Sequence, residues 1–322
     1  METDPLNVTQ TAPERIALGK TGIQISPLGV GTWQWGDRTF WDYGKGGYTD
    51  SDLRAGFEAS LRAGINFFDT AESYGSGRSE TLLGQAVRAS GQPVVVATKF
   101  MPYPWRLPRA SLMQALRRSL ERLGLERVDL YQIHWPFPPR PAESWAGALA
   151  DAVEAGLVKA VGVSNYSLAQ MRRTHDALAR RGVPLASNQV QFNLLDRSAE
   201  KTGLLGACQE LGITLIAYSP LSQGLLTGKY TPQHPPRGIR GFRYRRSLRP
   251  VQPLIGLLRE IGEAHGGKSP AQVALNWVTA KQAVPIPGAK NLQQAQENIG
   301  ALGWRLAEGE LAALDAASER MR

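Results

Sequence analysis

Short apolar runs alternate with longer amphipathic stretches along most of the chain. Each run is four to seven residues long, which is typical of strands that are buried on both faces. We predict strands at 28–33, 65–69, 94–99, 128–134, 158–163, 186–190, 213–217 and 283–286. Helical spacing of the apolar residues predicts helices at 51–63, 79–89, 109–123, 142–155, 168–180, 200–211, 254–264, 270–279, 292–301 and 308–318.

The alternation of strand and helix continues through eight units without a change in composition. Strands of this kind that cross over through helices form a parallel sheet, and eight of them close into a barrel. The fold class is therefore α/β, a (β/α)8 TIM barrel with an N-terminal β-hairpin at 15–26 and a C-terminal helical tail. We expect a flexible N-terminus at 1–14 and a single barrel domain at 15–322.

A doubly wound open sheet is the main rival fold. Such a sheet would carry a dinucleotide fingerprint of three glycines after its first strand, leading directly into a helix. The segment Gly29-Val30-Gly31-Thr32-Trp33 lacks the third glycine and continues into a Trp-rich loop. The sequence therefore favours the barrel.

Complementary polar groups stand at the ends of three consecutive predicted strands. Asp69 ends the second strand and is followed by Tyr74, Lys99 ends the third strand, and His134 ends the fourth. The active site of a barrel lies at the carboxyl ends of its strands, so we expect these four side chains to converge on one rim. The structural alternative is that the carboxylate caps a turn and the tyrosine only packs.

These four groups can polarise a carbonyl group and protonate its oxygen. We expect Asp69 to hold Lys99 charged, and the ammonium to lower the pKa of the Tyr74 hydroxyl. His134 can then hydrogen-bond to the carbonyl oxygen and fix its position. Because no side chain donates hydride, a reduced cofactor must supply it.

Other chemistries remain less favoured. Schiff-base aldolase chemistry also uses a lysine at a strand end, but a lysine held beside a carboxylate stays protonated and is a poor nucleophile.

A metal site is not expected, because the four histidines are scattered and no two stand at ligand spacing. The single cysteine, Cys208, lies in a helical pattern and is expected in the core.

Composition and charge limit the partners. Hydrophobic residues make up 42% of the chain and charged residues 20%, which suffices for a large core. The net charge of +9 comes from arginines spread along helical faces, so we expect no nucleic-acid partner.

Residues 1–14 contain no apolar segment and no stretch is long enough to span a membrane, which makes the cytoplasm the expected compartment.

Seven ordered motifs resemble the aldo-keto reductase superfamily. They are D-T-A-E-S-Y-G at 69–75, A-T-K at 97–99, Q-I-H-W at 132–135, G-V-S-N-Y at 162–166, N-Q-V-Q-F-N at 188–193, A-Y-S-P-L at 217–221 and I-P-G-A-K-N-L-Q-Q-A-Q-E-N at 286–298. The resemblance extends from the hairpin at residue 15 to the tail helix. It implies an NADPH-dependent reductase that converts a small carbonyl substrate into an alcohol.

The resemblance also implies roles for individual residues. The catalytic residues are Asp69, Tyr74, Lys99 and His134, with Tyr74 as the general acid. Ser164, Asn165 and Gln189 hold the nicotinamide carboxamide, and Tyr218 stacks on its ring. The remaining cofactor-binding residues are Ser219, Pro220, Leu221, Gly224, Lys229, Ile286, Gly288, Lys290, Gln294, Glu297 and Asn298.

Two positions depart from the pattern of many relatives at the adenosine end. Gly288 stands where many have a lysine, and Gln294 stands where many have a basic residue. Recognition of the 2′-phosphate then depends largely on Lys290, and one ammonium can suffice for a phosphate. We therefore expect NADP rather than NAD.

Rim aromatics are expected to form the substrate pocket, chiefly Trp33, Trp35, Tyr103 and Trp135, with Phe40, Trp41, Tyr43 and Trp105 as further candidates. Such a pocket suits aromatic, conjugated or heteroaromatic aldehydes. The first-loop pattern resembles bacterial and plastid reductases, among which pyridoxal reductase is a named activity.

Three further questions stay open at this level. The insertion after the seventh strand carries Arg237, Arg240, Arg243, Arg245, Arg246 and Arg249, and it is either a mobile clamp over the cofactor phosphates or a basic surface loop. Some relatives act as redox-sensing auxiliary β subunits of potassium channels and retain the same residues. The alternative function is therefore a redox-sensing, NADP-binding auxiliary subunit with little turnover. A monomer or a small homo-oligomer is expected.

Overall fold

The computed structural model describes residues 13–41, 43–44, 47–236 and 239–319, and it describes no side chain for Ile239, Arg240 or Arg243. Most of the predicted flexible segment 1–14 lies outside these ranges, as does Arg237 of the basic insertion.

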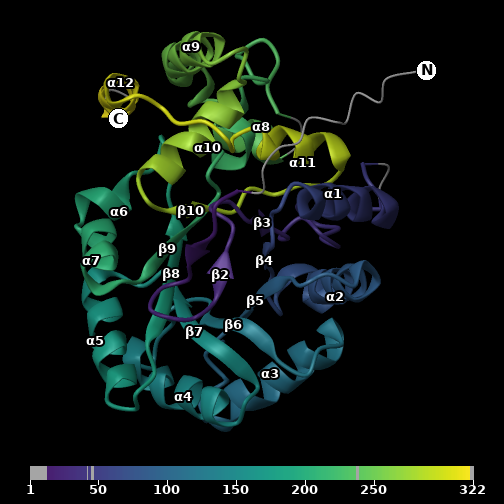
Figure 1. Ribbon diagram of the computed structural model, residues 1–322, viewed down its shortest axis with the longest axis vertical. Coiled ribbons are helices and arrows are strands. Elements are labelled where there is room, and N and C mark those ends of the chain that lie inside the picture. Colours follow the sequence, from purple (N-terminus) through teal and green to yellow (C-terminus); the bar gives the residue numbers. More distant parts are fainter. Residues whose placement is uncertain (1–12, 42, 45–46, 237–238, 320–322) are drawn as a thin grey trace.

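Eight parallel strands within the described ranges follow one another around the sheet in chain order (Figure 1). They are β3 (Val30–Gly31), β4 (Phe67–Asp69), β5 (Val95–Phe100), β6 (Val128–Ile133), β7 (Val158–Ser164), β8 (Leu185–Gln191), β9 (Thr214–Tyr218) and β10 (Val284–Pro285). The first and last strands also meet, because the Gly29 amide donates to Pro285 O at 2.9 Å and the Gly31 amide donates to Pro287 O at 3.1 Å. The predicted (β/α)8 barrel is confirmed.

Helices surround the strands on the outside of the barrel (Figure 1). They are α1 (Asp50–Arg62), α2 (Arg78–Ser90), α3 (Ala110–Leu123), α4 (Ala146–Glu154), α5 (Leu168–Ala179), α6 (Ser198–Lys201), α7 (Leu204–Leu211), α8 (Ile239–Tyr244), α9 (Leu248–Ala264), α10 (Pro270–Ala280), α11 (Leu292–Ile299) and α12 (Glu308–Glu319). Short 3-10 turns precede α2 and α4 and follow β9: η1 (Tyr74–Gly77), η2 (Ala142–Trp145) and η3 (Ser222–Thr227). None of the described helices combines the length and the apolar character needed to cross a membrane.

The predicted hairpin covers one end of the barrel. Its strands β1 (Ile16–Ala17) and β2 (Gln24–Ile25) pair antiparallel, and β2 lies across the barrel strands in Figure 1. Leu18 and Ile25 are fully buried and share a core cluster with Phe67 of β4. The opposite end of the barrel, where the strands terminate, stays available for a site.

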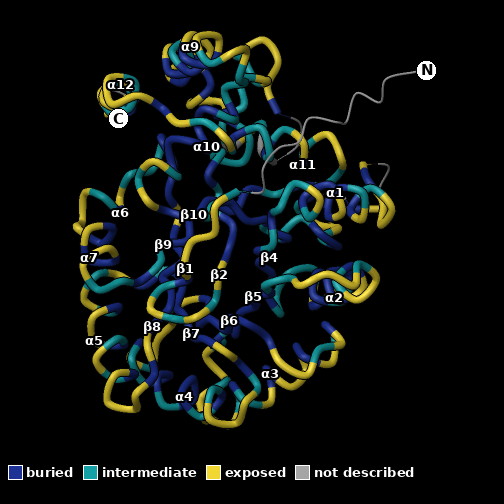
Figure 2. The backbone as a smooth tube through the Cα atoms, viewed as in Figure 1, coloured by how far each residue is buried: buried dark blue, intermediate teal, exposed yellow. Residues whose placement is uncertain are grey.

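Burial follows the two apolar faces that the sequence pattern requires. The barrel strands are almost wholly buried, whereas the helices expose their outer faces (Figure 2). One cluster fills the barrel interior and a larger one lies between the strands and the helices. Short, continuously apolar strands therefore make sense, because neither face of the sheet meets water.

Several helix predictions differ from the structure. The helix predicted at 200–211 is divided into α6 and α7, because Gly203 between them adopts a left-handed conformation with φ of 73°. Helix α9 begins at Leu248 rather than 254 and continues through Pro253, since Leu248 and Val251 bury their side chains on the core face. The short helix α8 was not predicted.

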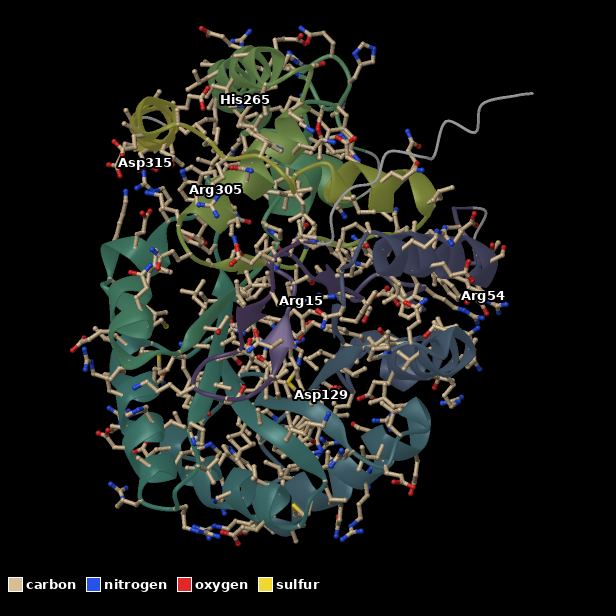
Figure 3. All side chains as sticks on the ribbon, in the orientation of Figure 1. Arg15, Arg54, Asp129, His265, Arg305 and Asp315 are labelled. Carbon is tan, nitrogen blue, oxygen red and sulfur yellow. The ribbon has the colours of Figure 1, made fainter. Side chains whose placement is uncertain are left out.

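The tail helix α12 attaches to the barrel wall through Asp315, which is labelled in Figure 3. Asp315 accepts hydrogen bonds from Trp277 Nε1 at 2.9 Å and from Lys281 Nζ at 2.6 Å. It also pairs with Arg197 at 3.5 Å. One carboxylate thus connects the tail to α10 and to the segment before α6.

The seam between β3 and β10 predicts a sensitive position. A Cβ atom at Gly31 would lie 2.8 Å from Ile286 O, so Gly31→Ala must push the two strands apart. We expect a loss of roughly 1–3 kcal/mol in the free energy of unfolding, measured with urea. Gly22→Ala is the control, because nothing lies within 4 Å of that Cβ position. Equal unfolding midpoints for the two variants would contradict a tightly closed seam.

Candidate active site

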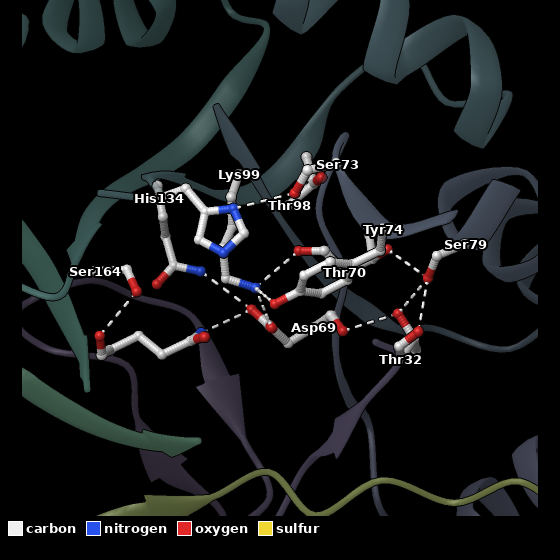
Figure 4. A network of polar contacts seen from close by, with 12 residues as sticks. Thr32, Asp69, Thr70, Ser73, Tyr74, Ser79, Thr98, Lys99, His134 and Ser164 are labelled. Atoms are coloured by element: carbon white, nitrogen blue, oxygen red, sulfur yellow. Dashed lines mark hydrogen bonds and ion pairs between the residues drawn. The ribbon is translucent and has the colours of Figure 1, made fainter. Parts of the chain in front are cut away.

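The four strand-end groups of the sequence prediction lie together at the carboxyl end of the barrel (Figure 4). Asp69 ends β4, Lys99 lies in β5, and His134 directly follows β6. Tyr74 begins the turn η1 after β4. Parallel strands with short loops are sufficient to bring them together, because the ends of neighbouring strands lie side by side.

A buried ion pair forms the base of the site. Lys99 and Asp69 are 0% and 1% exposed, and Lys99 Nζ donates to Asp69 Oδ1. The same ammonium donates to Thr70 O at 2.9 Å and to the Tyr74 hydroxyl at 3.3 Å. The three donor positions of the lysine are therefore all used, and one of them is directed at the tyrosine.

Two glutamines complete the coordination of the carboxylate. Gln132 Nε2 donates to Asp69 Oδ2 at 3.1 Å, and Gln189 Nε2 donates to the same oxygen at 2.9 Å. Sequence reasoning missed Gln132. It could have been found, because Gln132 stands two residues before His134 and therefore faces the same side of its strand.

Burial and charge set the protonation states of the site. Burial raises the pKa of Tyr74, and the Lys99 ammonium lowers it by less, so the pKa stays above its ordinary value of 10.0. Burial alone would lower the pKa of Lys99, but Asp69 and Tyr74 together raise it. The prediction of a lowered tyrosine pKa is therefore wrong in its net direction. Burial outweighs the ammonium, so Tyr74 holds its proton and Lys99 its charge.

His134 is neutral and held in place. Burial, with a smaller effect from Lys99, lowers the pKa of His134 well below 6.5. Its backbone amide donates to Phe100 O at 2.8 Å, and Ser73 Oγ lies 3.4 Å from its Nδ1. The imidazole meets the Tyr74 ring edge-on, with centroids 5.5 Å apart. A neutral imidazole and a protonated phenol each retain one hydrogen-bond donor, an N–H and an O–H.

A hydroxyl cluster supports the loop that carries Tyr74. Ser79 Oγ lies 2.7 Å from Thr32 Oγ1, accepts from Thr70 Oγ1 at 2.9 Å and donates to Thr32 O at 2.9 Å (Figure 4). All three residues are fully buried. The cluster joins β3, β4 and the first turn of α2, and the sequence analysis did not identify it.

A cavity of about 820 Å³ opens beside Tyr74 and His134. Asp69 reaches its wall, whereas Lys99 lies behind the other three groups and does not line it. Every residue predicted to bind the cofactor lines this cavity: Ser164, Asn165, Gln189, Tyr218, Ser219, Pro220, Leu221, Gly224, Lys229, Ile286, Gly288, Lys290, Gln294, Glu297 and Asn298. The cavity therefore continues from the strand ends to α11.

The wall nearest Tyr74 is a connected set of polar side chains. Asn165 Nδ2 donates to His134 O and to Ser164 Oγ, both at 3.0 Å, and Asn165 Oδ1 accepts from the Tyr218 hydroxyl at 2.9 Å. Asn165 adopts a left-handed backbone conformation with φ of 62°, as does Ser219 with φ of 49°. Strained backbone of this kind gathers at functional sites, where the surrounding contacts hold it.

The far end of the cavity carries cations. Lys290 Nζ lies over the rings of Tyr48 and Trp41, 5.0 and 5.7 Å from their centroids. The Lys290 amide donates to Gln294 Oε1 at 3.0 Å, so that glutamine orients the lysine backbone. Lys229 lines the cavity closer to η3.

The predicted substrate aromatics divide into two groups. Trp33 and Trp135 line the cavity, and so does Trp41. Trp35 does not, because it is 1% exposed and its Nε1 donates to Ala289 O at 2.9 Å. Tyr103 stacks on the exposed Trp105 outside the cavity wall, with centroids 4.7 Å apart. Sequence alone could not give these directions, since loop residues have no fixed periodicity.

The basic insertion reaches the cavity through Tyr244. The Tyr244 hydroxyl donates to Gln223 Oε1 at 2.6 Å, and Gln223 lines the cavity. Arg245, Arg246 and Arg249 are exposed. The cofactor clamp stays a prediction.

Comparisons with known proteins agree with this arrangement. The model of the Aldo/keto reductase family matches residues 27–319. The chain is 44% identical over 311 residues to "Pyridoxal reductase, chloroplastic" from Arabidopsis thaliana, covering 92% of this chain and 84% of that protein. It is 33% identical over 321 residues to L-glyceraldehyde 3-phosphate reductase from Escherichia coli (strain K12), covering 92% and 90%. A solved thermostable aldo-keto reductase in complex with the inhibitor epalrestat matches with a TM-score of 0.78 and 32% identity, over 94% of this chain and 99% of that one.

The lowered pKa of His134 predicts a pH dependence of stability. As pH falls below about 6.5, His134 becomes protonated in the unfolded chain but stays neutral in the folded chain. The folded state therefore loses stability. This group alone contributes a slope of up to about 1.4 kcal/mol per pH unit. Urea unfolding of His134→Asn should show a flatter decline in that range than the wild type. His234→Asn is the control, because His234 is exposed and should leave the slope unchanged. An identical slope in His134→Asn would contradict the buried neutral imidazole.

Proposed function

Because this chain belongs to the aldo/keto reductase family, a family of oxidoreductases, we propose that it is an NADPH-dependent reductase of aldehydes and ketones. The observation that carries the proposal is the Tyr74 hydroxyl, 3.3 Å from a buried ammonium, in the wall of a cavity that His134 also lines. In the proposed reaction the carbonyl carbon accepts a hydride and the carbonyl oxygen accepts a proton, which gives the alcohol.

The residues around the cavity fit a nicotinamide dinucleotide. Amide and hydroxyl groups lie near Tyr74, where a carboxamide needs hydrogen-bond partners, and the Tyr218 ring offers a flat surface for stacking. Lys229 and Lys290 lie where the phosphates would need cations. Gln189 Nε2 already donates one hydrogen bond to Asp69, so this nitrogen has only its second N–H left to hold the carboxamide. When bound, NADPH supplies the hydride.

Tyr74 is proposed as the general acid. Burial keeps its proton on at neutral pH, and Lys99 stabilises the phenolate that remains after the proton has moved to the carbonyl oxygen. The neutral His134 donates a second hydrogen bond to the same oxygen and so positions the carbonyl carbon. Asp69 does not touch the substrate; it keeps the ammonium charged and oriented.

The aromatic side of the cavity supports a substrate class. Trp33 stacks on Phe40 with centroids 5.3 Å apart, and Trp135 stacks on Phe137 at 5.9 Å. Flat apolar walls of this kind favour aromatic or conjugated aldehydes. Pyridoxal, a heteroaromatic aldehyde, is the first substrate to test, because the 44% identical relative is a pyridoxal reductase. Measurable steady-state turnover would also exclude a purely redox-sensing role.

The acid role of Tyr74 predicts a separation of turnover from cofactor binding. In Tyr74→Phe the turnover of pyridoxal or 4-nitrobenzaldehyde, followed by NADPH absorbance, should fall by about 10²-fold to 10⁴-fold, because the proton donor is lost. The dissociation constant for NADPH should change less than about twofold, since the substitution removes only a hydroxyl beside the nicotinamide end.

Tyr131→Phe is the matched control. Tyr131 is fully buried in β6 and its hydroxyl has no hydrogen-bond partner among the described residues, so its removal should leave turnover and stability unchanged. Equal turnover in Tyr74→Phe and Tyr131→Phe would show that Tyr74 is not the acid.

A further inference from the structure

The loop between β3 and α1 is fixed to the connection between β10 and α11. Trp35 Nε1 donates to Ala289 O at 2.9 Å. The Tyr48 hydroxyl donates to Gln34 O, which holds the loop backbone in the same region. Side chains of this loop thereby become part of the far end of the cavity, although they lie more than 240 residues away in the sequence from Lys290.

Gln34 is the polar side chain that this loop places in the cavity wall. Its amide lies directly over Gly288: a Cβ atom at position 288 would be 2.2 Å from Gln34 Oε1 and 2.4 Å from Nε2. The amide occupies this place only because residue 288 has no side chain. Gln34 Oε1 is buried and accepts no hydrogen bond from any described residue.

Because Oε1 is buried, Nε2 is the part of the amide left to contact a ligand in the cavity. A cation is connected to the same loop, since Lys290 Nζ lies 5.0 Å from the centre of the Tyr48 ring, and Tyr48 also holds the Gln34 backbone. A cation and a neutral amide donor are thus presented to the same end of the cavity.

We propose that Gln34 determines the choice between NADPH and NADH by contacting the adenosine ribose beside Lys290. Its Nε2 donates to the 2′-phosphate that Lys290 neutralises. This inference rests on the proposed cofactor. It also explains why residue 288 is a glycine, because a side chain there would displace the Gln34 amide.

Direct binding of the two dinucleotides tests the proposal without any turnover. Isothermal titration gives the dissociation constants of NADPH and NADH for the wild type and each variant. Gln34→Glu places a carboxylate against the phosphate, so NADPH should bind at least about tenfold more weakly while NADH binds as before or better. Gln34→Leu removes the amide group. It should weaken NADPH binding by a smaller factor than Gln34→Glu does, and it should weaken NADPH binding more than NADH binding.

Gly288→Ala tests the same contact from the other side. The added methyl group displaces the Gln34 amide, so this variant should reproduce the loss seen in Gln34→Leu. Combining the two substitutions should add little, because both remove one interaction.

Gln296→Glu is the matched control. It introduces the same charge on the exposed face of α11, outside the cavity lining, and should leave both constants within about twofold. The proposal is overturned if Gln34→Glu and Gln34→Leu change the two affinities equally or not at all, because Gln34 would then only fill the space above Gly288. Failure of the wild type to bind either dinucleotide would instead overturn the proposed cofactor together with this inference.

Discussion

The ion pair between Lys99 and Asp69 is the interaction around which the rim of the barrel is arranged. Neither side chain is exposed, and two charges without water are costly unless every hydrogen-bonding position is used. Asp69 meets this requirement through Lys99, Gln132 and Gln189, which come from three different strands. The pair therefore fixes β4 relative to β5, β6 and β8 at the level where the cavity begins. A barrel can supply these partners because its parallel strands all end at one rim.

The same pair defines the chemistry of Tyr74. Burial keeps the phenol protonated, and the ammonium behind it stabilises the charge that would appear if the proton left. Lys99 itself does not line the cavity, so any effect it has on a molecule bound there would pass through the tyrosine. His134 stays neutral in the same surroundings, which leaves the ammonium as the cation of this cluster.

Much of this arrangement could be predicted from the sequence, because it follows from periodicity. Short apolar runs indicate doubly buried strands, and polar residues at their ends indicate the rim, which placed Asp69 and Lys99 correctly beside each other. Contacts across the barrel could not be predicted in this way. Gln132 stands within an apolar strand, and Gln34 reaches Gly288 only when the barrel closes. The direction of the pKa shift of Tyr74 could not be predicted from the sequence either, since it depends on how far burial outweighs the charge of Lys99. Trp35 shows the same limitation of sequence-based prediction for loops. The composition of a loop indicates that aromatic side chains are present, but not which of them face the cavity.

The central claim is that Lys99 stabilises the phenolate of Tyr74. A titration of tyrosine ¹³Cζ resonances by NMR measures it directly, with Tyr74 assigned from Tyr74→Phe and compared between the wild type and Lys99→Met. The substitution leaves Gln132 and Gln189, the other hydrogen-bond donors to Asp69, unchanged. We predict a higher pKa of Tyr74 in Lys99→Met than in the wild type, because burial then acts without the opposing ammonium. An unchanged or lower pKa in the variant would contradict the account.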